Sequence, residues 1–218
     1  MNSEDINCVM QILREDCRHW PTPSVTVISE KDRNPFTVLI SCIISLRTKD
    51  AVTAMSSARL FAVASSPLEM LSLTVEDIAG LIYPAGFYRN KARQIRSICE
   101  QLVSSYSSIV PDEIEQLLTF KGVGRKTANL VVTLGYGKPG ICVDTHVHRI
   151  TNRWGYLCTK TPEQTEQVLR SRLPEKFWIE INDLLVCYGQ NRCFPVSPAC
   201  SLCRIAFCCN KEAVKRSR

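Results

Sequence analysis

Residues 120–129 read FKGVGRKTAN. Two glycines bracket a single valine here, and glycine permits a tight reversal with positive φ and the close approach of another backbone. The preceding segment, 111–119, begins Pro-Asp-Glu, which is typical of a helix start because acids suit the helix dipole there. We therefore predict two helices joined by a glycine turn, the second running from Arg125 to about Leu134.

The glycine turn is a candidate anion site. A helix start presents backbone N–H groups that have no acceptor within the helix, and these groups attract phosphate. Val123 is placed to fill the gap between the two helices. Such a helix-hairpin-helix grips a DNA phosphate through main-chain amides, whatever the base sequence. A Gly-x-Gly turn between helices is also common in proteins that bind no nucleic acid, so the turn alone leaves both interpretations open.

Helical signals dominate the rest of the chain. Asn34-Pro35 is typical of an N-cap followed by proline at the first helical position. Thr74 and Thr161 begin patterns close to a capping box. Only residues 24–28 alternate like a strand. We therefore predict about ten helices with short connections, an all-α protein.

The composition describes a globular chain. Its 218 residues are enough for one large domain or two small lobes, with 45% hydrophobic and 22% charged residues. No apolar run approaches the ~20 residues of a membrane span. Residues 1–5, MNSED, lack the basic start and apolar core of a signal peptide. We therefore expect an intracellular protein with no membrane association, in which twelve cysteines favour metal ligation over disulfides.

The net charge of +6 permits binding to nucleic acid without requiring it. Its distribution is more informative, because basic residues cluster near the middle of the chain. One cluster contains Arg89, Lys91, Arg93 and Arg96. Solvated helix faces are the alternative explanation for such clusters.

Lys126 lies in the first turn of the second predicted helix. The helix dipole disfavours a positive charge at this end, which favours the neutral amine. A neutral lysine amine is a nucleophile and forms Schiff bases. A simple phosphate contact is the alternative role for a lysine at this place.

Asp144 follows 18 residues later and precedes a segment, 147–154, that looks helical. It is either a plain helix cap or an ionised carboxylate that stabilises an oxocarbenium-like sugar cation and relays protons. His146 is placed to tie this acidic turn by hydrogen bonding, and we expect His148 at the surface or beside a phosphate. Neither histidine has the pairing expected of a metal site.

Four cysteines within 17 residues follow the spacing C-x6-C-x2-C-x5-C near the C-terminus. They are Cys193, Cys200, Cys203 and Cys209. Four thiolates suit zinc, although structural zinc sites usually combine two separated C-x2-C pairs. Convergent cysteines are also what an iron–sulfur cluster requires. We expect the other cysteines, apart from Cys208 beside the set, to be buried small apolar residues: Cys8, Cys17, Cys42, Cys99, Cys142, Cys158 and Cys187.

Three motifs together resemble the endonuclease III family of DNA repair glycosylases. They are residues 122–129, the acidic turn 143–146 and the cysteine loop 193–209. All three gaps between the cysteines equal those of the family's 4Fe–4S loop, so the resemblance implies a 4Fe–4S cluster on Cys193, Cys200, Cys203 and Cys209. The same spacing favours Cys209 over its neighbour Cys208 as the fourth ligand.

The resemblance also implies a two-lobed helix-hairpin-helix DNA glycosylase fold. Residues 28–138 are expected to form a helical lobe that carries the hairpin. Residues 1–27 together with 139–218 are expected to form a second lobe that bears the cluster loop, with substrate DNA lying across the cleft between the lobes.

The function that this resemblance implies is base excision repair. The chain is expected to be a bifunctional DNA glycosylase and abasic-site (AP) lyase that removes damaged pyrimidines. Lys126 occupies the position of the family's nucleophile, which forms a Schiff base that undergoes β-elimination, and Asp144 that of the assisting carboxylate. The expected partner is double-stranded DNA with a damaged base or an abasic site, bound by a monomer in the cytoplasm or nucleoid of a prokaryote.

The expected DNA contacts come from the hairpin, the acidic turn and two loops. Those of the first two are Gly122, Val123, Gly124, Arg125, Thr127 and His146. The enzyme must extrude the damaged base and fill the emptied stack. Arg47 stands where the family often has the glutamine that fills this gap, and Phe87 where it often has a wedging leucine. A surface charge for Arg47 and a core aromatic for Phe87 are the alternatives.

Two further departures from the family pattern concern charge. Lys121 stands where the family usually has proline. Residues 194–199 carry no charge where the family often has basic residues, and the flanking Arg192 and Arg204 are candidates to replace them.

Two rival functions are an adenine glycosylase, which needs no lysine nucleophile, and a non-enzymatic iron–sulfur DNA-binding protein. Lys126 argues against the first, and the second predicts no strand scission.

Overall fold

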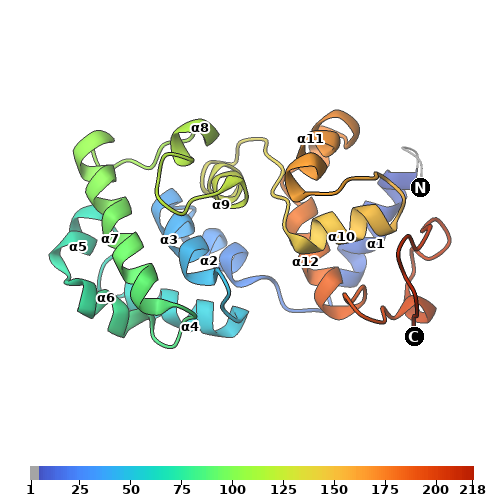
Figure 1. Cartoon of the computed structure of the whole chain (residues 1–218), viewed down its shortest axis with the longest axis horizontal. Helices are drawn as coiled ribbons and strands as arrows, with labels where there is room; N and C mark the ends of the chain where they lie inside the picture. The colour runs from blue at the N-terminus through green and yellow to red at the C-terminus, as the bar shows by residue number, and fades with distance from the viewer. Residues whose placement is uncertain (1–4) are drawn as a thin grey trace. The chain divides into compact units, whose positions relative to one another are not determined.

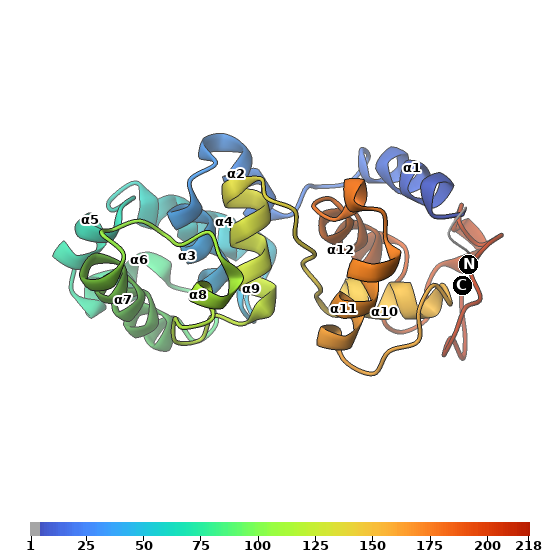
Figure 2. The same cartoon turned by 90° about the horizontal axis from the view of Figure 1, so that it is seen from above.

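A computed structural model describes residues 5–218, which form helices joined by turns and loops, with no β-strand (Figures 1 and 2). The all-α prediction is confirmed. One local prediction is wrong, because residues 24–28 belong to helix α2 (Ser24–Asp32). Residues 1–4 of the acidic start lie outside the described part of the chain. None of the helices in residues 5–218 is long and apolar enough to cross a membrane.

The chain divides into two compact units, of which one is Ser24–Lys138. Besides α2, its helices are α3 (Pro35–Ser45), α4 (Asp50–Phe61), α5 (Pro67–Ser72), α6 (Val75–Ile82), α7 (Tyr88–Ser105), α8 (Ile114–Leu117) and α9 (Arg125–Leu130). Every residue of α3 from Phe36 to Ile44 is buried, as expected of a helix that is apolar on all sides. It packs against α2, α4, α7 and α9, while α5 and α6 pack against α7 (Figure 1). The central helix therefore holds the whole unit together.

Helix starts in this unit have the caps that the sequence predicts. The Asn34 side chain accepts a hydrogen bond from Phe36 N at 2.9 Å, ahead of Pro35. Thr74 and Asp77 form a reciprocal capping box at the start of α6. Each such cap contributes about 1 kcal/mol of helix stability.

The second unit is built from both ends of the chain, up to Pro23 and from Pro139 onward. Its helices are α1 (Asp5–Cys17), α10 (Thr145–Arg153), α11 (Pro162–Arg172) and α12 (Ile181–Asn191), with 3₁₀ turns at Glu175–Phe177 and Cys200–Leu202. α12 packs against both α1 and α10. The apolar face of α1, with Ile6 and Leu13, joins Trp154, Tyr156 and Tyr188 in one buried cluster. Burial of each such side chain stabilises the unit by about 1.5–3 kcal/mol.

The two helices of the predicted hairpin differ in detail from the expectation. α8 spans only Ile114–Leu117, not 111–119. The second helix starts at Arg125 as predicted, but after α9 it becomes a π-helix, Val131–Gly135. A Cβ on Gly135 would lie 2.9 Å from Pro35 Cα, so the wider turn brings this helix end against the start of α3.

Candidate functional site

The glycine turn joins α8 to α9 as the sequence predicts. Phe120 and Val123 are buried, and Val123 N donates to Phe120 O at 3.0 Å. Gly122 has a φ of 78°, in the left-handed region that other residues rarely adopt. Val123 therefore fills the gap between the helices, and the reversal depends on glycine at position 122.

The two glycines have different surroundings. A Cβ on Gly122 would lie 2.3 Å from Nε2 of Gln94, a side chain of α7 that donates to Lys121 O at 2.9 Å. A Cβ on Gly124, the N-cap of α9, would meet no heavy atom within 4 Å. The turn is therefore closed on the side facing α7 and open beside Gly124, where α9 begins.

Lys126 is the second residue of α9, and its side chain is exposed. Its charge interacts with the Cys42 thiol in α3, where burial raises the pKa of that thiol to about 12. Arg125, next to it, lies 3.9 Å from Glu115 across the turn. Thr127, which is also expected to contact DNA, is buried, so that contact is expected through its main chain.

Arg47 and Phe87 lie on two neighbouring loops of the same unit. The Arg47 guanidinium carbon is 5.6 Å from the centroid of the Phe87 ring. Both side chains are exposed, Phe87 to 60%, so it is not the core aromatic that the sequence left open as an alternative. We call Arg47 and Phe87 the candidate wedge.

In the second unit, Asp144 is the N-cap of α10. One carboxylate oxygen accepts hydrogen bonds from His146 N at 2.8 Å and Val147 N at 2.9 Å. The residue is 9% exposed. These two amide donors hold the carboxylate at the start of α10. Capping and a reactive role use the same geometry, so the cap does not exclude the reactive role.

His146 and His148 lie on opposite sides of the first turn of α10. Nδ1 of His146 is 3.2 Å from Nη2 of Arg149, and the ring lies against the backbone of α12 at Gly189. His148 is half-buried and bonds to Thr165 at 2.7 Å.

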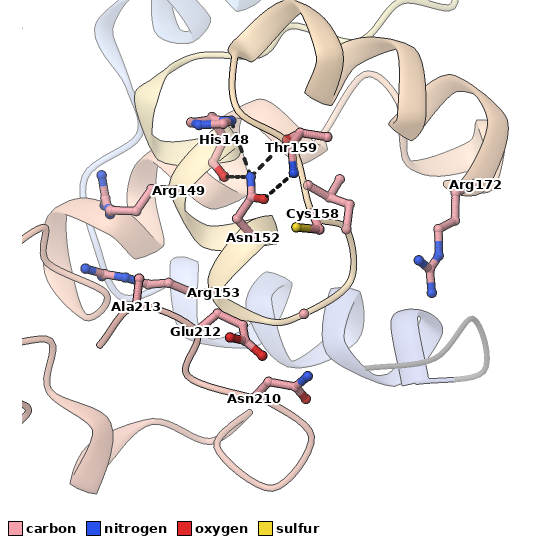
Figure 3. Close-up of a pocket in the computed structure, with 12 residues that line it drawn as sticks. His148, Arg149, Asn152, Arg153, Cys158, Thr159, Arg172, Asn210, Glu212 and Ala213 are labelled. Atoms are coloured by element: carbon pink, nitrogen blue, oxygen red, sulfur yellow. Dashed lines mark hydrogen bonds between the residues drawn. The ribbon is translucent and has the colours of Figure 1, made fainter. Parts of the chain in front are cut away.

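A pocket of ≈ 780 Å³ lies beside His148 (Figure 3). Asn152 forms its polar wall, because its side chain bonds to the His148 carbonyl and to both N and Oγ1 of Thr159. Neither Asp144 nor any of the four spaced cysteines lines this pocket. The hydrogen bonds drawn in Figure 3 join Asn152 to His148 and Thr159, and the arginines and Glu212 that also line the pocket are not among them.

The four spaced cysteines come together. Cys193, Cys200, Cys203 and Cys209 are half-buried and line one small pocket, which Cys208 does not line. Among the described residues, no three or more His, Cys, Asp or Glu side chains are placed so that they could hold a metal ion. A pocket surrounded by four soft thiols fits an inorganic group that is bound through sulfur.

Residues outside the motifs hold this cysteine loop, and the sequence did not single them out. Arg153 of α10 donates to Phe194 O and Pro195 O, both at 2.6 Å, and to Cys193 Sγ at 3.4 Å. Arg149, one turn earlier, donates to Cys193 O at 2.8 Å, and burial lowers the pKa of this guanidinium. Tyr188 Oη lies 3.2 Å from Cys203 Sγ. The sequence does contain a signal for the two arginines. Arg149 and Arg153 are four residues apart in the helix after Asp144, so they lie on the same helix face.

Two arginines beside this loop make contacts within their unit. Arg204 binds Glu15 and Asp16 of α1, both at 2.9 Å, and Arg192 lies over the Trp20 ring. Both stay candidates to replace the missing basic residues, whereas burial of the other cysteines is confirmed only in part. Cys8 and Cys158 are exposed and Cys17 is half-buried, whereas Cys42, Cys99, Cys142 and Cys187 are buried as expected.

The chain is similar in sequence and in fold to proteins that repair DNA. Residues 40–175 match the family model of the HhH-GPD superfamily base excision DNA repair proteins. Endonuclease III of Thermotoga maritima is 43% identical over 195 residues, which cover 89% of this chain and 89% of that protein. A solved non-covalent endonuclease III–DNA complex and a trapped endonuclease III–DNA covalent intermediate each have a TM-score of 0.85 and 30% identity. Each covers 97% of this chain, and the matches take in 96% and 97% of those two chains.

Proposed function

The chain belongs to the HhH-GPD superfamily of base excision DNA repair proteins and, within it, to the endonuclease III family, and we propose that Lys126 and Asp144 carry its chemistry. It is a bifunctional DNA glycosylase and abasic-site lyase that binds damaged duplex DNA. The observation that carries the proposal is the exposed amine of Lys126 in the first turn of α9, directly after the glycine turn.

The proposed reaction begins with the neutral amine of Lys126. Its nitrogen attacks the anomeric carbon of the sugar, the bond from that carbon to the base breaks, and the base leaves with the electron pair and takes up a proton. Opening of the sugar then gives a Schiff base between Lys126 and the DNA. Loss of a proton from the neighbouring sugar carbon expels the 3′ phosphate, which completes β-elimination and cuts the strand.

Asp144 is proposed to assist in two ways. Its ionised carboxylate stabilises the positive charge that develops on the sugar as the base departs. It also takes up a proton during the attack, since the amine must lose one to remain bonded to carbon. The two N–H donors at the start of α10 support this assignment because they hold the carboxylate in one position.

The remaining DNA contacts extend this proposal. The amides of Gly122, Val123, Gly124 and Arg125 are proposed to hold a phosphate at the open side of the glycine turn, and His146 of the second unit is proposed as a separate DNA contact. The candidate wedge is proposed to enter the stack that the extruded base vacates. The proposed substrates are damaged pyrimidines, and the proposed place of action is the cytoplasm or nucleoid of a prokaryote.

The cysteine pocket is proposed to hold a 4Fe–4S cluster on Cys193, Cys200, Cys203 and Cys209. Its four thiols, with the Arg153 guanidinium at Cys193 and the Tyr188 hydroxyl at Cys203, support this choice because both groups donate toward ligand sulfurs. When bound, such a cluster fixes the loop through four iron–sulfur bonds and takes no part in strand cleavage.

The test of the nucleophile is covalent trapping with borohydride. Wild-type protein mixed with duplex DNA that carries one abasic site should give a stable protein–DNA adduct, because borohydride reduces the Schiff base. The Lys126→Gln variant should give none, since an amide nitrogen forms no Schiff base.

Lys121→Gln is the matched control, because Lys121 is exposed on the same turn and lies outside the proposed chemistry. It should retain trapping with somewhat weaker DNA binding. Undiminished trapping in Lys126→Gln would reject this lysine as the nucleophile. Absence of trapping and of strand scission in the wild type would favour a non-enzymatic DNA-binding protein.

A further inference from the structure

The side chain of Lys91, in α7, is buried with a full set of hydrogen bonds. The residue is 5% exposed. Its Nζ donates to Ile44 O at 2.7 Å, Leu46 O at 2.5 Å and Thr48 Oγ1 at 2.8 Å. A lysine ammonium has three donors, so all of them are used, and all three acceptors are neutral oxygens. Lys91 therefore fixes the backbone where α3 ends and the next loop begins.

Thr48 extends this set of bonds to a second loop. Its hydroxyl accepts from Lys91 and from Gly86 N at 3.1 Å, and it lies 3.2 Å from Leu46 O, to which it donates. One donor and two acceptor positions are thereby all occupied. A Cβ on Gly86 would lie 2.4 Å from Arg47 O, so the two loops touch at this point.

The two residues held by this arrangement are those of the candidate wedge. Arg47 lies between Leu46 and Thr48, and Phe87 follows Gly86. Both have left-handed backbones, with φ of 51° for Arg47 and 58° for Phe87. A residue with a Cβ keeps such a conformation only where its surroundings impose it. The bonds of Lys91 and Thr48 hold Leu46 and Thr48 on either side of Arg47, and that of Thr48 holds Gly86 directly before Phe87.

A plain helix cap is the alternative role for Lys91, since lysines near a helix end often bind the last carbonyls. Such lysines gain this interaction at the surface, where their charge stays hydrated. Burial of Lys91 instead lowers the pKa of its amine to about 8, although the three oxygen acceptors favour the charged form. One of the three bonds, moreover, leads through Thr48 to Gly86 and away from α3. A cap does not require this last bond, whereas a fixed distance between two loops does.

We infer that Lys91 and Thr48 are positioning residues that hold Arg47 and Phe87 together in the geometry needed to enter the DNA stack. The inference rests on the proposed role of the candidate wedge and adds the two residues that hold the wedge in its geometry. Lys91 touches neither the substrate nor Lys126 in this scheme. Its effect is on extrusion of the damaged base, and the chemistry at an already exposed sugar does not depend on it.

Four variants test this inference. Lys91→Met keeps the length of the side chain and removes all three donors. Thr48→Val keeps the shape of the side chain and removes the bridging hydroxyl, while Thr48→Ser retains that hydroxyl. Ile98→Val, two turns further along α7 and equally buried, is the control for loss of packing in the same helix.

Two readouts separate extrusion from chemistry. Fluorescence of 2-aminopurine beside a lesion in duplex DNA reports unstacking, and cleavage of an abasic site in single-stranded DNA reports the lyase step, which needs no wedge. Lys91→Met and Thr48→Val should each lower the unstacking rate and duplex excision at least about tenfold. Single-stranded cleavage should stay within about twofold of wild type in both, and Thr48→Ser and Ile98→Val should resemble wild type in every assay.

Unchanged unstacking in both Lys91→Met and Thr48→Val would overturn the inference. So would a parallel loss of unstacking and single-stranded cleavage, because that is the result of damaged folding. Failure of the wild type to cleave abasic DNA would instead contradict the proposed function, and the unstacking signal would still decide whether Lys91 acts on the wedge.

Discussion

At the residue scale, the candidate wedge combines exposure with backbone strain. Left-handed torsions cost a residue with a Cβ about 1–2 kcal/mol, and Arg47 and Phe87 both adopt them while their side chains remain in solvent. The contact of the Arg47 guanidinium with the Phe87 ring offsets only part of that cost. Strain of this kind clusters at sites where a protein contacts a ligand.

Replacement of Arg47 by alanine should change which opposite base the enzyme prefers. A guanidinium presents a rigid fork of donors and pairs bidentately with the edge of guanine, a contact with about 1–3 kcal/mol of discrimination. We expect Arg47→Ala to lower excision most, by about tenfold, when guanine lies opposite the lesion. The measurement is single-turnover excision of one pyrimidine lesion placed opposite each of the four bases.

Arg89→Ala is the control for this prediction, because Arg89 is an exposed arginine that stacks on Tyr88, next to the wedge. It should slow excision similarly for all four bases, if at all. An equal loss across the four bases in Arg47→Ala would assign Arg47 to backbone contact. No loss at all would place it away from the DNA.

The family resemblance pointed to the candidate wedge but not to Lys91. Arg47 and Phe87 were named because they stand where the family often has glutamine and leucine. Lys91 was only one of several basic residues in a cluster, since its carbonyl acceptors are 45 and 47 residues away. Burial of a charge that is satisfied by distant backbone leaves no local pattern in a sequence.

At the element scale, α7 braces both features of its unit that are proposed to contact DNA. Lys91 binds the loops of the candidate wedge, and Gln94, three residues later, binds Lys121 O in the glycine turn. Three residues correspond to about 4.5 Å along a helix axis. The two contact points on α7, one for the candidate wedge and one for the glycine turn, therefore lie within one turn of the same helix.

The two glycines of the turn should respond differently to alanine. Gly122→Ala places a Cβ in the left-handed region and against Gln94, so it should lower the free energy of unfolding by about 1–2 kcal/mol. Gly124→Ala places its methyl group in open space at an extended backbone and should cost less than about 1 kcal/mol. Denaturant unfolding of the two variants measures this difference.

DNA affinity should follow the opposite order. The methyl group of Gly124→Ala lies where a phosphate must approach the amides of α9, so binding to abasic duplex DNA should weaken more than stability explains. Fluorescence anisotropy with labelled DNA measures it. Unchanged affinity in Gly124→Ala would show that no phosphate is held at this side of the turn.

Local patterns predicted helix starts well and helix lengths less well. Asn34, Thr74 and Asp144 cap helices because capping needs only a side chain and the next two or three amides. Residues 24–28 alternate like a strand, yet they form a helix whose first residue binds the Asp50 carboxylate through its N and Oγ. That partner lies 26 residues away, so no window of local sequence contains it.

At the scale of the whole molecule, the all-helical architecture was predictable and the second unit's core was not. Capping signals and helical periodicity recur along the chain and need no tertiary information. The packing of α1 on α12, and the ion pairs of Arg204 with Glu15 and Asp16, join residues more than 160 positions apart. Such pairings follow from the fold and leave no trace in either segment alone.

The cysteine loop gives a prediction that separates two adjacent residues. Cys209 lines the pocket with the other three spaced cysteines, whereas the Cys208 thiol lies against Ile205 O outside it. Cys209→Ser should lose most of the iron and destabilise the C-terminal residues. Cys208→Ser should retain about four irons per chain and the visible absorbance of the cluster.

Iron, zinc and acid-labile sulfide are measured on anaerobically purified protein for this comparison. Equal iron loss in the two variants would contradict the choice of Cys209. Stoichiometric zinc with negligible iron in the wild type would replace the cluster with a zinc site.

The division of the chain also fixes an order of events during its synthesis. Ser24–Lys138 is continuous and has its own core around α3, so it can fold as soon as it leaves the ribosome. The unit that contains α1 receives α10, α12 and the four spaced cysteines only after the whole of Ser24–Lys138 has been translated. The apolar face of α1 is therefore without these partners on the nascent chain while the continuous unit is being made. The cysteine loop can mature only after the continuous unit has had the opportunity to fold.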